Sequence, residues 1–162
     1  MLIAAAAVYG GGSYTALKRE QLNELDALCH TLRLMQDELE TRALPLPELA
    51  AQLDTRTENA GKALLSGLLR RLPELGSRDF QNIWEECVTE SVKHSEEAAR
   101  LLCTLGSFLG RYDVDGQSEA IRSCRETLEK LRTTAAEALP QTRRLGMGLA
   151  LTSGALIVIT LI

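Results

Sequence analysis

The cysteines and histidines are the side chains of this sequence best suited to nucleophilic or metal chemistry. Cys29 directly precedes His30, and adjacent helix positions do not share a face, so we do not expect a Cys–His nucleophile there. No two cysteines form a CxxC pair, and each lies among apolar neighbours in a helix-like stretch. We therefore expect reduced, buried thiols rather than disulfides or metal ligands. The four cysteines are Cys29, Cys87, Cys103 and Cys124.

Asp113 and Asp115 lie in a glycine-containing turn, where carboxylates could bind calcium. The remaining ligands of an EF-hand are missing, so we interpret the turn as a capped helix start. The sequence also has no HExxH zinc motif and no GxxxxGK[ST] phosphate loop. We therefore predict no catalytic residue, metal ligand, cofactor or small-molecule substrate. Loss of function on neutral substitution of Cys29, His30 or His94, with the fold intact, would favour an enzyme instead.

The composition favours helices and argues against nucleic acid as a partner. Aromatic residues make up 4% of the chain and only four residues are proline, while leucine and alanine dominate. The 22 acidic and 18 basic residues give a net charge of -4. A mixed, mildly acidic surface does not provide the concentrated basic face that binds phosphates.

Both ends of the chain lack charged residues, and every Lys, Arg, Asp and Glu lies between Lys18 and Arg144. A helix of the length of segment 1–17 spans about 26 Å, close to the lower limit for crossing a bilayer. A secretory signal peptide is the alternative for this segment, but no basic residue precedes Lys18. We predict an N-terminal transmembrane segment (1–17), a helical domain (18–144) and a C-terminal transmembrane segment (145–162).

The C-terminal segment has small residues at four-residue intervals, at Gly146, Ala150 and Gly154. Small residues at this spacing allow two membrane helices to approach closely. The same residues are also compatible with ordinary glycine and alanine usage in a membrane helix, and the sequence leaves both interpretations open.

The basic residues beside the two hydrophobic segments predict their orientation. Lys18 and Arg19 follow the first segment, and Arg143 and Arg144 precede the second. Because basic residues favour the cytoplasmic side, both segments place the central domain in the cytoplasm and both termini across the cell membrane.

Hydrophobic periodicity and helix-stop residues predict six helices in the central domain. The first and last are long and carry apolar stripes, and we expect them to pack together as a stalk. The stripe of the last helix has the three-four spacing of a heptad seam: Ile121, Cys124, Leu128, Leu131, Ala135 and Ala138. The predicted spans are Thr15–Arg42, Pro47–Arg56, Glu58–Leu72, a fourth helix capped by Ser77 or Asp79, a fifth from Ser95 to Gly110, and Asp115–Leu139.

The resulting fold class is all-α, an antiparallel helical bundle whose two stalk helices continue into the N- and C-terminal membrane segments. The shorter helices are expected to cap the far end of the stalk. Trp84 is in phase with Phe80, Cys87 and Val88, which predicts a core position. Pro140 is expected to kink or break the chain before the second membrane segment.

Several stretches of this sequence resemble the stage III sporulation protein AB family of endospore-forming bacteria. The best of them is LGSFLGRYDVDGQ, residues 105–117, in which Leu109, Gly110, Asp113 and Gln117 match a Leu-Gly…Asp…Gln motif. The stretches LPLPELA and WEECV and the two hydrophobic ends are similar as well, so the resemblance covers essentially the whole chain.

The resemblance implies a place in the machinery that links mother cell and forespore. Members of the family are expected in the mother-cell membrane during sporulation, and they look similar to the platform protein of type II secretion and type IV pilus systems. The implied partners are a secretion-type ATPase, the stage III sporulation protein AA-like protein, and other membrane proteins of the stage III sporulation A operon.

The motif also has a physical interpretation that does not depend on the family. Gly110 can adopt the left-handed conformation that ends a helix, and Asp113 can accept turn amides or cap the next helix. Gln117 can then hydrogen-bond back from its first turn, so the motif would set the angle between two helices. Two functions remain open: a scaffold that couples an ATPase to the envelope, or a membrane adaptor that oligomerises through the seam or the small-residue face without a motor.

Overall fold

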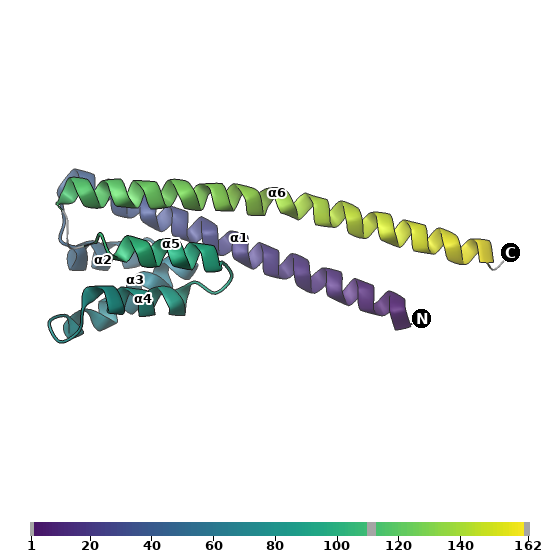
Figure 1. The fold of residues 1–162 in the computed structure, drawn as a ribbon, viewed down its shortest axis with the longest axis horizontal. Coiled ribbons are helices and arrows are strands. Elements are labelled where there is room, and N and C mark those ends of the chain that lie inside the picture. Colours follow the sequence, from purple (N-terminus) through teal and green to yellow (C-terminus); the bar gives the residue numbers. More distant parts are fainter. Residues whose placement is uncertain (1, 110–112, 161–162) are drawn as a thin grey trace.

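The computed structural model describes residues 2–109 and 113–160, with side chains from 16 to 109 and from 113 to 138. All regular elements of this part are helices, so the all-α prediction is confirmed for it (Figure 1). The elements are α1 (Leu2–Arg42), α2 (Leu46–Asp54), α3 (Asn59–Arg71), the 3-10 helix η1 (Leu72–Glu74), α4 (Phe80–Ser91), α5 (Glu96–Gly106) and α6 (Val114–Thr160).

The two long helices, α1 and α6, lie side by side and run in opposite directions (Figure 1). Arg132 of α6 bonds Asp26 of α1, and Ser118 of α6 bonds Glu40 at 2.6 Å. Residue numbers therefore rise along one helix as they fall along the other. The antiparallel arrangement places both ends of the chain at the same end of the molecule, beyond the short helices.

Four of the six residues of the apolar seam of α6 are buried within the chain, and Leu131 and Ala138 are partly buried. Ile121 and Leu128 are 0% exposed, and Cys124 and Ala135 are buried as well. The facing stripe of α1 is equally buried and comprises Leu25, Leu28, Leu32, Met35 and Leu39. Because the most extensive helix–helix contact among the described residues joins α1 and α6, the two stripes cover each other.

The short helices lie along the side of the stalk, which differs from the prediction that they cap its far end. Gly61 of α3 lies against Thr31 and Ala27, in the C-terminal half of α1 but three to four turns before its end. The loop between α4 and α5 bonds Glu24, nearer still to the chain termini. A short amphipathic helix buries more of its apolar stripe along the side of a longer helix than across its end.

Trp84 lies at the centre of the contact between α4 and α5. It is 0% exposed, which confirms the predicted core position. Its indole Nε1 donates to the carbonyl of Leu102 at 2.6 Å, and Gly106 allows the ring to approach the backbone of α5. A Cβ on Gly106 would lie 2.3 Å from Cδ1 of Trp84, so only glycine fits this position without movement.

Two helix C-termini differ from the predictions by four residues or more. The fifth helix ends at Gly106, with Ser107 as its C-cap, rather than at Gly110, which lies outside the described residues. The last helix continues through Pro140 to Thr160, so this proline does not break it, and a kink there stays a prediction. A proline removes only one backbone donor, and the neighbouring hydrogen bonds can carry the helix past it.

Within the described part of the chain, no helix includes a stretch long and apolar enough to cross a membrane. The predicted membrane segments, residues 1–17 and 145–162, fall almost entirely outside the residues whose side chains are described.

Candidate functional site

The connection between α5 and α6 contains the motif that the sequence singles out. It lies at the end of the molecule opposite the chain termini, together with the α1–α2 and α3–α4 turns (Figure 1). We call the described residues of these three connections, 43–45, 72–79, 107–109 and 113, the distal end. Leu109 is 1% exposed and belongs to the core, so this part of the motif anchors the connection to the bundle.

Asp113 caps the N-terminus of α6. Its Oδ1 accepts the amide of Gly116 at 3.1 Å, and its carbonyl accepts the amide of Gln117 at 3.0 Å. A carboxylate in this position satisfies an amide of the first turn and interacts favourably with the helix dipole. Asp113 and Gln117 are therefore joined through the first turn of α6, and this turn sets where the long helix begins.

Glu40 connects the last turn of α1 to the first turns of α6. Its Oε1 accepts from Ser118 Oγ at 2.6 Å and from Gln36 Nε2 at 2.8 Å. The hydrogen bond from Ser118, and then that from Gln36, lowers the pKa of the Glu40 carboxyl below its ordinary value. Gln36 and Glu40 could be paired from their four-residue spacing, but Ser118 is 78 residues away and gave no such signal.

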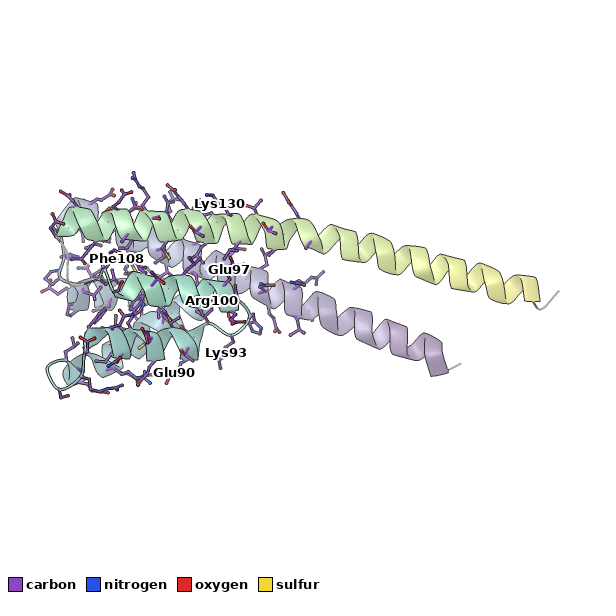
Figure 2. The ribbon with its side chains drawn as sticks, in the orientation of Figure 1. Glu90, Lys93, Glu97, Arg100, Phe108 and Lys130 are labelled. Atoms are coloured by element: carbon purple, nitrogen blue, oxygen red, sulfur yellow. The ribbon has the colours of Figure 1, made fainter. Side chains whose placement is uncertain are left out.

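The distal end also exposes large apolar side chains. Leu75 is 40% exposed and Phe108 is 37% exposed, and Leu17, near the other end of the described residues, is 56% exposed. Figure 2 places Phe108 beside the end of α5. A shallow hollow lined by Glu40, Ser118, Glu119 and Arg122 lies next to these turns. This mixture of apolar and charged groups is typical of protein contact surfaces rather than of small-molecule sites.

A second long-range connection lies nearer the termini, at the loop between α4 and α5. Glu24 is only 6% exposed. Its carboxylate accepts hydrogen bonds from the backbone amides of Lys93 at 2.8 Å and of His94 at 3.1 Å. His94 Nε2 also lies 3.6 Å from Glu20 Oε2. We call this loop, residues 92–95, the proximal loop; sequence reasoning missed its contact with Glu24.

The thiols are all free, and two of them lie on the facing sides of α1 and α6. Burial, followed by the charge of Glu129, raises the pKa of Cys29 to about 11. Burial, followed by the nearby Cys29, raises the pKa of Cys124 to about 12. Both thiols are therefore protonated at neutral pH, and a thiol in this state is a poor nucleophile and metal ligand. Cys87 is buried and Cys103 partly buried, and no group of metal-binding side chains occurs among the residues searched in this structure.

The small-residue face at Gly146, Ala150 and Gly154 lies in the part of α6 whose side chains are not described. Its packing role remains a prediction.

The family model and the solved structure that match this chain belong to the same family. All of the chain, residues 1–162, matches the family model described as stage III sporulation protein AB. A solved structure titled "Stage III sporulation protein AB (SpoIIIAB)" is similar, with a TM-score of 0.64 and 20% identity over 75% of this chain and 97% of that chain. At this identity the likeness concerns the fold. No match is found among curated proteins.

Proposed function

The chain belongs to the stage III sporulation protein AB family, and we propose that it is a non-enzymatic membrane platform of the channel between mother cell and forespore. Membership of the family supports a role in sporulation. The proposal adds that the protein is anchored in the mother-cell membrane and couples a cytoplasmic ATPase to the envelope complex.

The observation that carries this proposal is that α1 and α6 extend past the short helices at the same end of the molecule (Figure 1). Residues 2–17 and 145–160 of the charge-free segments form the ends of these two helices. Two membrane segments joined by one domain must enter and leave on the same side, and an antiparallel helix pair satisfies this condition. The basic residues at 18, 19, 143 and 144 favour the cytoplasmic side for the domain.

The distal end is the surface that we propose for the ATPase, a stage III sporulation protein AA-like protein. It is the part of the domain farthest from the proposed membrane, and it presents Leu75 and Phe108 to solvent. The hydrogen bond from Gly116 connects Asp113 of this surface to α6, and the hydrogen bond from Ser118 to Glu40 joins α6 to α1. Motion of the ATPase would enter here and pass along α1 and α6 to the other membrane proteins of the stage III sporulation A operon.

The alternative function is an adaptor that oligomerises without a motor, either through the heptad seam or through the small-residue face. The structure argues against the seam. Ile121 and Leu128 of the heptad seam are fully buried in this chain's own core, so this part of the seam already packs within the chain. Oligomerisation through Gly146, Ala150 and Gly154 remains the form that the alternative would take.

Binding between the full chain, in detergent micelles, and the purified ATPase tests the proposal. We expect a complex that forms at tens of micromolar or below, measured by microscale thermophoresis. Leu75→Ser should weaken it about tenfold, because an exposed leucine at a contact contributes on the order of 1–2 kcal/mol.

Leu17→Ser is the control, since Leu17 is also an exposed leucine, at 56%, but lies at the opposite end of the molecule, where the N-terminal segment borders the domain. It should leave the affinity unchanged. Absence of binding at tens of micromolar would rule out coupling to this ATPase, and equal losses from both variants would rule out the distal end as its contact surface.

A further inference from the structure

We propose that the proximal loop, residues 92–95, rests on the headgroups of anionic lipids, with Lys93 and His94 as its contact residues. The inference rests on the proposed membrane anchoring and adds a second contact between the domain and the bilayer. The proposed interaction surface is separate from the distal end.

The position of the loop along α1 places it at the level of the lipid headgroups. Glu20 follows Leu17, the last residue of the charge-free segment, by three positions, or about 4.5 Å of helix. The headgroup layer extends roughly 5–7 Å beyond the hydrocarbon core on each side. His94 Nε2 lies 3.6 Å from Glu20 Oε2, and helical side chains lean toward the N-terminus, here toward the membrane. The tip of the loop therefore reaches the headgroup layer.

The charges nearest the proposed membrane are basic. Lys18, Arg19, Arg143 and Arg144 border the two charge-free segments. Lys93 adds an exposed ammonium group that forms no ion pair with any described residue. A basic side chain near an anionic membrane surface is attracted to it.

The two carboxylates of α1 beside the loop, Glu20 and Glu24, are engaged within the protein. Glu20 faces His94, and Glu24 accepts two backbone amides. Glu96 and Glu97 are exposed in the first turn of α5, where the positive end of the helix dipole offsets part of their charge. From this turn α5 runs toward the distal end (Figure 1). Lys93 is thus the charge of this loop that is available to a lipid phosphate.

The loop is held in place before any lipid binds. The two hydrogen bonds to Glu24 fix its backbone, Val92 is 7% exposed, and Ser95 caps α5 by accepting the amide of Ala98. A preorganised loop loses little conformational entropy on binding. The contact would therefore fix the tilt of the bundle against the bilayer without ordering any new segment.

Amine acetylation of the full chain tests the inference without any substitution. The sequence has lysines at positions 18, 62, 93 and 130, and Figure 2 shows Lys93 on the loop and Lys130 on α6. The chain is reconstituted in phosphatidylcholine vesicles with and without phosphatidylglycerol, and a membrane-impermeant reagent labels the domains that face outward. Mass spectrometry then gives the acetylation rate at each lysine.

We expect Lys93 to react about fivefold more slowly when phosphatidylglycerol is present, the factor that corresponds to about 1 kcal/mol per basic residue near an anionic surface. Lys130 is exposed as well but lies farther from the proposed membrane, so it should react at the same rate with and without phosphatidylglycerol. Equal rates at Lys93, or equal slowing at Lys93 and Lys130, would overturn the proposed contact.

Flotation of the same vesicles after carbonate washing reports membrane anchoring separately. A chain that floats but leaves Lys93 unprotected overturns only the lipid contact of the loop. A chain that does not float overturns both this contact and the anchoring on which it rests.

Discussion

Glu24 is a carboxylate in an almost fully buried residue that receives two backbone amides. Burying an ionised group is costly unless hydrogen bonds replace its hydration, and amides of a loop can do so. The sequence could not predict this arrangement, because the donors are 69 and 70 residues away. From its spacing alone, Glu24 belongs equally well to the solvated side of a long helix.

Removal of this carboxylate should destabilise the protein. Glu24→Ala leaves the amides of Lys93 and His94 without their acceptor, and we expect the free energy of unfolding to fall by about 1.5–3 kcal/mol. Urea unfolding followed by the fluorescence of Trp84, the only tryptophan, measures it. Glu20→Ala removes an exposed carboxylate and should change stability by less than about 1 kcal/mol; equal effects of the two variants would contradict the role given to Glu24.

Gly106 is required by the close approach of Trp84 to α5. Gly106→Ala would place a methyl group 2.3 Å from the indole, and we expect a loss of about 1–3 kcal/mol from the resulting displacement. Gly67→Ala is the matched control, because its Cβ would meet Cys87 Sγ at an ordinary 3.5 Å. It should be neutral or stabilise α3 by up to about 1 kcal/mol. Urea unfolding measures the free energy of unfolding of both variants. Equal losses in the two would contradict the requirement for glycine at position 106.

The pKa of Glu40 provides a test of the connection between α1 and α6. Because its folded-state pKa is lowered, chiefly by Ser118, the stabilisation is present above the ordinary carboxyl pKa of about 4.3 and is lost as pH falls through the lowered value. Ser118→Ala should raise the pKa of Glu40, measured by carboxyl carbon NMR. It should also destabilise the protein at neutral pH more than in acid. Thr127→Ala, which removes a hydroxyl bonded only within α6, should leave that pKa unchanged; a similar shift in both variants would contradict the contact.

For the α1–α6 pair, the sequence predicted which residues are buried but not which element covers them. The three-four spacing of Ile121, Cys124 and Leu128 predicted a buried stripe, and these residues are buried. Periodicity could not identify what covers the stripe, because a second copy and another helix of the same chain bury it equally well. The structure covers it with α1.

We therefore expect the seam to contribute to folding rather than to assembly. Leu128→Ala should lower the free energy of unfolding by about 2–5 kcal/mol, the usual cost of removing a buried leucine side chain. Its sedimentation coefficient in micelles should match that of the unmodified chain. Dissociation of a dimer on this substitution, seen by analytical ultracentrifugation, would instead show that the seam joins two copies.

Helix ends were predicted less well than helix positions, because tertiary contacts help to determine where a helix ends. The fifth helix was expected to end at Gly110 because glycine commonly follows a helix C-terminus. Gly106 ends it instead, at the position where Trp84 packs against the backbone. A glycine needed for close packing and a glycine needed for a left-handed turn look the same in a sequence.

At the scale of the whole molecule, the charge distribution and the fold point to the same architecture. The charge-free ends predicted two membrane segments, and the antiparallel pairing of α1 and α6 brings both ends of the chain to one side of the bundle (Figure 1). The arrangement of the short helices along the stalk could not be predicted, because it depends on contacts such as those of Glu24 and Gly61. It brings the proximal loop close to the proposed bilayer and leaves the distal end for a partner.

Reporter fusions at both termini in sporulating cells test the central claim, anchoring at both ends with the domain in the cytoplasm. We expect alkaline phosphatase to be active at the N-terminus and at the C-terminus, since it folds only outside the cytoplasm, while green fluorescent protein at either position stays dark. An inactive phosphatase and a fluorescent protein at either terminus would place that end in the cytoplasm and contradict the account.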